Sequence, residues 1–164
     1  LINSTNAEFS PGTSAFYPAG FSTSLFSLKN DNASNSSGDD YVAWIWSEIK
    51  GFSKFGKYKG NNNNDGPVIY CGFRPAWVLV KRVNDTGNWQ LGSNKTLSST
   101  GLPLTFYPNS QLEEQNEGDF DFLSTGFKIK STGTDANGSG DDYLFCAFAD
   151  APLVNSNGVP TTCG

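Results

Sequence analysis

Short apolar runs alternate with polar, turn-forming residues along the 164-residue chain. Runs rich in aromatic and β-branched side chains, bounded by Gly, Pro, Asn and Asp, predict β-strands. We expect strands at residues 21–28, 41–46, 52–60, 68–71, 76–83, 88–92, 120–123, 127–130 and 143–149. No segment sustains the i, i+3, i+4, i+7 apolar spacing of an amphipathic helix. The pattern therefore predicts an all-β fold, an antiparallel β-sandwich or jelly roll.

The segment 41–46 reads Tyr-Val-Ala-Trp-Ile-Trp and is almost continuously apolar. Such continuity is typical of a central strand that is covered on both faces. Residues 95–117 are polar by contrast, and we expect them to be irregular. The length fits one β domain over residues 1–164, with a core at about 16–152 and a tail at 153–164. The first residues do not form a signal peptide, so we expect the domain to be the C-terminal part of a longer chain.

The pentapeptide Ser-Gly-Asp-Asp-Tyr occurs twice, at residues 37–41 and 139–143. Each copy follows a predicted strand that begins with Gly-Phe and a polar loop, and each precedes an apolar run. Matched flanks of this kind indicate an internal repeat. Each copy is predicted to form a β-hairpin with a long polar loop. The two hairpins would be equivalent pairs in two sheets or neighbours in one.

The acidic residues of the repeat, Asp39 with Asp40 and Asp141 with Asp142, allow two interpretations. Two carboxylates beside loop carbonyls offer the oxygen ligands that calcium prefers. Alternatively, Asp in a turn accepts hydrogen bonds from backbone amides, and the Tyr begins a strand. The chain has no Asp-x-Asp-x-Asp-Gly loop with its bidentate Glu, so the turn interpretation is the simpler one. Apart from calcium, no cofactor is expected.

The composition argues against most catalytic chemistry. The chain contains no histidine, which excludes Ser-His-Asp and Cys-His sites. Isolated carboxyls such as Glu48 and Asp119 leave only a weak case for a glycosidase. The net charge of −5 disfavours nucleic acid as a partner, and no run approaches the roughly 18 apolar residues of a membrane span. The three cysteines lack metal-site spacing, and we expect free thiols.

Binding is the function that the residue types favour. Asn-rich loops beside aromatic side chains are typical of carbohydrate sites, and the candidate contacts are Tyr58, Asn61, Asn62, Asn63, Asn64 and Asp65. The same four-Asn segment also fits a tolerant loop tip with no ligand. Trp44 and Trp46 would share one face of a strand, either as core residues or as stacking surfaces for sugars.

Four segments resemble a known family. They are residues 48–61 (EIKGFSKFGKYKGN), 72–82 (GFRPAWVLVKR), 122–128 (FLSTGFK) and 143–152 (YLFCAFADAP). Together they resemble an uncharacterised C-terminal domain family of tail-fibre-like and other virion structural proteins of bacteriophages, mainly marine ones. The resemblance runs from about residue 21 to residue 160. One departure is the sequence Trp-Gln-Leu-Gly-Ser at 89–93, where members often carry an Asp.

The resemblance implies a location on the virion surface and no enzymatic activity. We therefore expect a structural domain of a tail fibre, spike or capsid fibre that contacts glycans or a receptor on the host surface. Other virion proteins or copies of the same chain would be its partners, and a trimer would fit because fibres are commonly trimeric. The alternative is a purely architectural module, such as a capsid decoration, that binds other virion proteins.

Overall fold

The computed structural model of the chain describes residues 4–7, 24–25, 28, 35–115, 118–150, 153–154 and 160–161. The chain divides into two units. One consists of Leu1–Ala7 with Ser47–Gly164, and the other is Glu8–Trp46. All strands among the described residues belong to the first unit.

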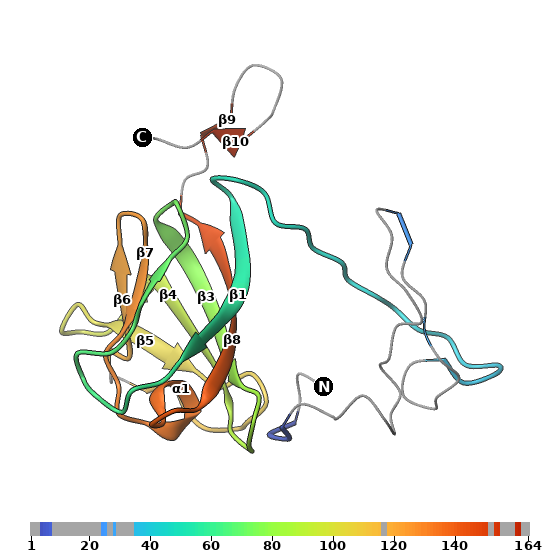
Figure 1. Ribbon diagram of the computed structural model, residues 1–164, viewed down its shortest axis with the longest axis horizontal. Helices are drawn as coiled ribbons and strands as arrows, with labels where there is room; N and C mark the ends of the chain where they lie inside the picture. Colours follow the sequence, from blue (N-terminus) through green and yellow to red (C-terminus); the bar gives the residue numbers. More distant parts are fainter. Residues whose placement is uncertain are drawn as a thin grey trace. The chain divides into compact units, whose positions relative to one another are not determined.

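The larger sheet of the first unit has five antiparallel strands. They are β1 (Ser53–Lys59), β3 (Pro75–Arg82), β4 (Trp89–Leu97), β5 (Pro103–Phe106) and β8 (Asp142–Ala149). Their order in the sheet is β1-β8-β3-β4-β5, so β8 lies between β1 and β3 (Figure 1). Strands β3 and β4 form a hairpin in which Leu79 lies opposite Leu91.

The smaller sheet has three antiparallel strands in the order β2-β7-β6. They are β2 (Val68–Tyr70), β6 (Phe120–Leu123) and β7 (Gly126–Ile129). A one-turn helix, α1 (Thr134–Asn137), lies in the connection from β7 to β8. Two short strands, β9 (Leu153–Val154) and β10 (Pro160–Thr161), pair with each other.

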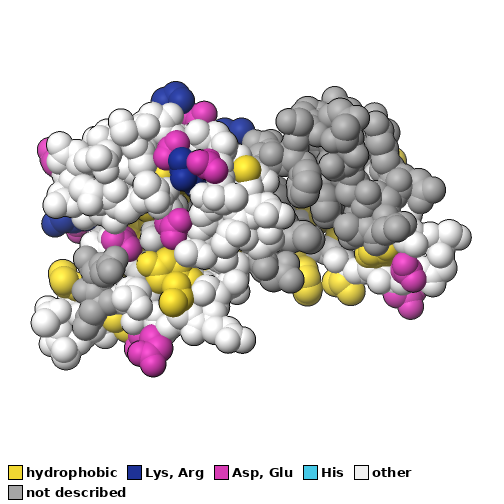
Figure 2. Space-filling view, turned by 90° about the horizontal axis from the view of Figure 1, so that it is seen from below, with side chains coloured by type: hydrophobic (Ala, Val, Ile, Leu, Met, Phe, Trp, Pro, Cys, Tyr) yellow, Lys and Arg dark blue, Asp and Glu magenta, His cyan; other side chains and the backbone are white. Residues whose placement is uncertain are grey.

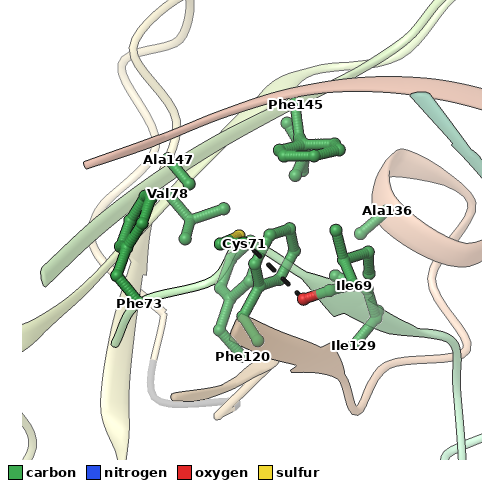
Figure 3. Close-up of a cluster of buried hydrophobic side chains, with 11 residues drawn as sticks. Ile69, Cys71, Phe73, Val78, Phe120, Ile129, Ala136, Phe145 and Ala147 are labelled. Carbon is green, nitrogen blue, oxygen red and sulfur yellow. Dashed lines mark hydrogen bonds between the residues drawn. The ribbon is translucent and has the colours of Figure 1, made fainter. Parts of the chain in front are cut away.

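The core lies between the two sheets, and its residues follow the period of two that strands impose. In β8, Tyr143, Phe145 and Ala147 are buried, whereas the residues between them are half-buried on the opposite face. The buried cluster takes side chains from both sheets (Figure 3): Ile69, Cys71, Phe73, Val78, Val80, Phe120, Phe127, Ile129, Ala136, Phe145 and Ala147. Each large member contributes roughly 1.5–3 kcal/mol by leaving water. The molecule is therefore a β-sandwich, as predicted.

Close approach between the sheets requires a glycine in β4. A Cβ atom on Gly92 would lie 2.4 Å from the ring of Phe120 in the facing sheet. Contacts that short do not occur in folded proteins, so any larger residue would push the sheets apart.

Most predicted strands of the first unit are confirmed, and two regions differ. Strand β4 extends to Leu97, and β5 lies within the stretch 95–117 that we expected to be irregular. The second half of β4 is exposed and polar, so its sequence lacks the apolar alternation that predicts a strand. Cys71 and Cys146 are free thiols, as expected, and burial raises the pKa of Cys71 to about 12. The predicted strand 21–28 and Cys163 fall outside the described residues, apart from positions 24, 25 and 28.

The second unit contradicts the prediction of a central strand at 41–46. No strand forms there, and the side chains of Val42, Trp44, Ile45 and Trp46 are 76%, 73%, 71% and 63% exposed. An apolar run predicts a covered strand only if a partner covers it. Among the residues that the structure describes, no hydrogen-bonded strand does so.

The two copies of Ser-Gly-Asp-Asp-Tyr adopt the same local structure. In the first, the Asp39 amide donates to the Ser36 carbonyl at 3.4 Å, and in the second the Asp141 amide donates to the Gly138 carbonyl at 3.2 Å. The glycines at 38 and 140 have φ of +88° and +75°, a conformation that favours glycine. Both copies therefore form a turn, and the hydrogen bonds that close it come from backbone amides and the Tyr hydroxyl, whereas the turn interpretation assigned that role to the Asp side chains.

A tyrosine hydroxyl completes each turn. The Tyr41 hydroxyl accepts a hydrogen bond from the Ser36 amide at 3.0 Å, and the Tyr143 hydroxyl accepts one from the Gly138 amide at 2.7 Å. We call this arrangement the Tyr-capped turn. The predicted hairpin is wrong for the second copy, because β7 and β8 lie in different sheets and the loop between them crosses the sandwich.

Candidate functional site

Three loops meet at the end of the sandwich that carries α1 (Figure 1). We call this region the loop end and define it as residues 60–66, 83–88 and 130–141. The Gly60 amide donates to the Asp141 carbonyl at 3.0 Å, and the Gly140 amide donates to the Gly60 carbonyl at 3.0 Å. The Asn84 side chain donates to the Asp141 carboxylate at 3.1 Å. These bonds join the three loops into one surface.

Asn137, at the C-terminal end of α1, is the central residue of the loop end and is fully buried. Its side-chain nitrogen lies 3.0 Å from Asn61 Oδ1, 2.9 Å from the Asn63 carbonyl and 2.7 Å from the Ser131 carbonyl. Its side-chain oxygen accepts from the Asn61 amide at 2.8 Å, and its carbonyl accepts from the Asn62 amide at 2.8 Å. A buried amide satisfied on both sides fixes the path of the loop 60–66.

The Asn-rich loop also bonds to itself. The Asn63 amide donates to Asn61 Oδ1 at 3.1 Å, and the Asp65 amide donates to Asn63 Oδ1 at 2.9 Å. Asn62 has φ of +51°, which Asn tolerates better than most residues. The hydrogen bond and charge of Lys128 lower the pKa of the Asp65 carboxyl. The side chains of Asn61 and Asn63 therefore build the loop and are committed to it.

Two stacked tyrosines hold the loop 130–141 through their hydroxyl groups. The rings of Tyr58 and Tyr143 lie 5.0 Å apart and nearly parallel. Tyr58 donates its hydroxyl to the Ala136 carbonyl at 2.7 Å, and Tyr143 donates its hydroxyl to the Thr134 carbonyl at 2.5 Å. Burial raises the pKa of Tyr143 to about 12 and holds the pKa of Tyr58 well above its usual value. Tyr58 thus supports the loop from within, and its hydroxyl is engaged.

A second polar cluster holds the loop 83–88. The Asp135 carboxylate accepts from the Asn88 amide and from the Asn88 side chain, both at 3.0 Å. Asn109 donates to the Asn88 side-chain oxygen at 2.9 Å. The Gly87 amide donates to the Thr5 carbonyl at 2.9 Å, so a segment near the start of the chain is also fixed here.

The structure places the four candidate calcium ligands in two units. Asp141 lies 2.9 Å from an Arg82 nitrogen, and Asp142 lies 2.7 Å from the Lys59 ammonium group. Asp39 and Asp40 belong to the other unit. Within the described ranges, no three Asp, Glu, Cys or His side chains come together as metal ligands. Calcium binding stays a prediction.

The carboxyls considered for acid–base chemistry lie in different surroundings. Asp119 is 2% exposed, and burial raises its pKa against the opposing hydrogen bonds from Ser131 and Thr105. Glu48 is half-exposed and pairs with Lys54. The charge of Asp135 also raises the pKa of Asp119, and the Asp135 carboxylate is itself engaged by the backbone and side chain of Asn88.

Two side chains of the loop 60–66 remain for an external ligand. Asn62 and Asn64 are exposed, and in the part of the chain that the structure describes their side-chain amides make no hydrogen bond. The described part of the face shown in Figure 2 is mainly uncharged, with scattered acidic, basic and hydrophobic groups. Each amide offers donors and an acceptor, so this surface matches ligands rich in hydroxyl groups.

Sequence reasoning found the exposed loop but missed the residues that hold it. Asn137 and Asp135 read as members of an ordinary polar loop, yet they bond the other two loops in place. No local signal marks Asn137 as buried, because its partners Asn61 and Asn63 are more than 70 residues away. For the loop 130–141, the sequence signal was the second Ser-Gly-Asp-Asp-Tyr copy, which ends in the buried Tyr143.

The first unit is a small antiparallel β-sandwich whose polar loops at one end are held in place by hydrogen bonds. The chain belongs to a family described as a domain of unknown function, DUF7483, whose model matches residues 1–152. No curated protein and no solved structure matches the chain. No helix among the described residues is both long and apolar enough to cross a membrane.

Proposed function

We propose that the chain is a non-catalytic attachment module that contacts host-surface glycans through its loop end. One observation carries the proposal: the amides of Asn62 and Asn64 are exposed on a loop whose backbone is fixed by the buried Asn137. A ligand that meets a pre-ordered loop does not have to order it, which improves affinity. Amides next to backbone carbonyls suit the paired donors and acceptors of sugar hydroxyls.

The location that we propose is the surface of a bacteriophage particle. This part rests on the resemblance to virion structural proteins. Three of the matched segments, 72–82, 122–128 and 143–152, coincide with framework strands of the sandwich. The fourth ends at Asn61, and the exposed amides begin one residue later. A shared framework with a free loop tip is the arrangement expected of binding modules that differ in ligand.

Attachment would gain strength from copy number. A single loop end offers few contacts, and its affinity for a glycan would be low. Several copies on one particle raise the overall avidity by roughly 10²–10⁴ without any new contact. The proposal therefore needs only a weak site on each chain.

A glycan array with the 164-residue chain, displayed in several copies on a bead, tests the proposal. We expect binding to a subset of surface polysaccharides and its loss in Asn62→Ala/Asn64→Ala. The matched control is Asn35→Ala/Gln111→Ala, which removes two exposed amides elsewhere and should keep full binding. Equal binding by both double variants, or no binding by the parent chain to host cells, would contradict the proposal.

The architectural alternative has one observation of its own. Val42, Trp44, Ile45 and Trp46 are a run of large apolar residues that are all exposed, and exposed apolar surface in proteins marks contacts with other proteins. Gold labelling of the chain on intact particles separates the two functions. Labels at fibre tips favour attachment, and labels along a capsid or tube, with the loop end covered, favour architecture.

A further inference from the structure

The residue after the buried Asn137 is a glycine, and this pair is chemically labile. Two Asn-Gly pairs occur in the chain, and the other, at 157–158, lies outside the described residues. Asparagine is among the thermolabile residues of proteins. Its side-chain amide carbon can be attacked by the backbone nitrogen of the next residue, and a glycine there has no side chain to hinder the approach. The centre of the loop end therefore contains a residue pair prone to deamidation.

The fold requires a glycine at position 138. A Cβ atom there would overlap Asp141 Oδ2 and would lie 3.2 Å from the Tyr143 hydroxyl. The Asp141 carboxylate cannot readily move away, because it is bonded to Arg82 at 2.9 Å and to Asn84 at 3.1 Å. A larger residue at this position would therefore push apart the loops that meet here.

The fold equally requires an asparagine at position 137. Its side-chain nitrogen faces three oxygen atoms, Asn61 Oδ1 and the carbonyls of Asn63 and Ser131, and its oxygen accepts the Asn61 amide. An amide carries a donor side and an acceptor side, and this arrangement uses both. A carboxylate only accepts hydrogen bonds, so an aspartate here would turn an oxygen towards three other oxygens. The loop 60–66 would lose the contacts that fix it.

In the folded chain both reacting groups are held. The Gly138 amide, whose nitrogen would attack, is buried and donates to the Tyr143 hydroxyl at 2.7 Å. This hydroxyl is itself fixed, because it donates to the Thr134 carbonyl at 2.5 Å. The Asn137 side chain is fully buried, so water does not reach the carbon that would be attacked. Reaction therefore needs a local opening of the loop end.

We infer that Asn137–Gly138 is a deamidation site that the folded loop end keeps closed and that disables the loop end once it reacts. When the site opens, the Gly138 nitrogen gives its proton to water or hydroxide and forms a bond to the Asn137 side-chain carbon. The side-chain nitrogen takes up a proton and leaves as ammonia. Water then opens the cyclic imide at either carbonyl, which leaves aspartate or isoaspartate at position 137.

The site would set a limit on the lifetime of the loop end. Each opening exposes the pair to reaction, and the product cannot return to asparagine because ammonia has left. A chain that has opened often therefore loses the fixed loop 60–66, whereas an undisturbed chain keeps it. The reaction does not depend on glycan binding, and only its effect on attachment rests on the proposed function.

The first Tyr-capped turn provides an internal control. Counted back from each tyrosine, Asn35–Ser36 corresponds to Asn137–Gly138. In both copies the amide after the asparagine donates to the tyrosine hydroxyl. Asn35 is exposed, whereas Asn137 is fully buried. The substitution Ser36→Gly makes the two copies identical from the asparagine to the tyrosine, so the two asparagines then differ in burial and not in local sequence.

Peptide mapping of the Ser36→Gly chain by mass spectrometry tests the inference. In mildly alkaline buffer without denaturant, we expect Asn35 to deamidate at least about tenfold faster than Asn137, because reaction at Asn137 waits for an opening. In urea, where both segments are unfolded, the two rates should agree. Equal rates in the folded chain would overturn the inference.

The Tyr143 hydroxyl is tested against a core variant. Tyr143→Phe removes the acceptor of the Gly138 amide, whereas Val78→Ala weakens the core in the middle of β3. The two variants are compared at urea concentrations that give them the same stability. We expect deamidation at Asn137 to be roughly 2–10-fold faster in Tyr143→Phe, as the loss of one hydrogen bond implies. Equal rates would contradict the role of this hydroxyl in closing the site.

The effect of the reaction is tested with Asn137→Asp, and Asn64→Asp is the matched control because its side chain is exposed. The amides of Asn61 and Asn62, which are bonded to Asn137, should exchange with deuterium at least about tenfold faster in Asn137→Asp and at the parent rate in the control. If Asn137→Asp does not fold, the parent chain is deamidated in urea and refolded, and molecules modified at position 137 should be missing from the folded fraction. Unchanged exchange, or a full share of modified molecules in that fraction, would show that the reaction does not disable the loop end.

Discussion

The two copies of the Tyr-capped turn share a local structure and differ in everything that follows. Both use a glycine with positive φ and a tyrosine hydroxyl that accepts a backbone amide. After the second copy, Tyr143 is fully buried and β8 lies within the sheet. After the first, Tyr41 is 44% exposed and the apolar run remains in water. Local sequence therefore determines the turn, and only tertiary partners determine whether the next strand is buried.

The largest difference between the two regions should appear on truncation of an aromatic side chain. We expect Phe145→Ala to lower the free energy of unfolding by about 3–5 kcal/mol, because Phe145 contacts the facing sheet through Phe127. Trp44→Ala should change it by less than about 0.5 kcal/mol when the chain is dilute. Urea unfolding followed by circular dichroism measures both. Equal losses would mean that residues 41–46 are as buried as β8.

A smaller difference should separate the two tyrosine hydroxyls. Tyr143→Phe leaves the Gly138 amide and the Thr134 carbonyl without their partner inside the protein, at a cost of about 1–3 kcal/mol. Tyr41→Phe releases an amide that water can reach, and we expect less than about 0.5 kcal/mol. Thermal unfolding of the two variants measures the loss of stability that each substitution causes. A large effect of Tyr41→Phe would contradict the view that this turn stands in solvent.

The dependence of folding stability on pH above 10 tests whether Tyr143 is as buried as the second turn requires. Burial raises the pKa of Tyr143 from 10.0 to about 12, so the folded state holds this proton more tightly than the unfolded state does. Its contribution is complete below pH 10 and is lost as the pH rises towards 12. We expect Tyr143→Phe to flatten the fall in stability over this window, measured by denaturant unfolding at several pH values. If stability falls with pH as steeply in Tyr143→Phe as in the parent chain, the Tyr143 hydroxyl is not the group that causes the fall.

The smallest effect concerns calcium. In the second copy the carboxylates of Asp141 and Asp142 face Arg82 and Lys59, so cations already balance them. We expect a chelator to leave the melting temperature unchanged. Because a ligand that binds the folded state raises apparent stability, a fall on chelation and recovery with calcium would favour the metal interpretation of the repeat.

The sandwich was largely predictable from the sequence because its inward side chains repeat every second residue. Strands β3 and β8 carry that pattern in strongly apolar runs. The same reasoning failed for residues 41–46, since an apolar run does not say whether a partner is present. It also missed β5, which is held by its register with β4 and by the paired backbone of Thr105 and Gln115.

The candidate site was predictable only as an exposed loop. Four successive asparagines indicate a loop tip, and that is where Asn61–Asp65 lie. Their division into structural and exposed amides depends on Asn137, more than 70 residues away, and no short-range pattern contains that information. The role of Tyr58 was likewise decided by a distant partner, the ring of Tyr143.

Hydrogen exchange tests the contrast between the two copies most directly. In a dilute sample the amides of residues 144–148 should exchange only by global unfolding, whereas those of 42–46 should exchange at close to the rate of an unstructured peptide. Strong protection of residues 42–46 in the dilute sample would contradict the account.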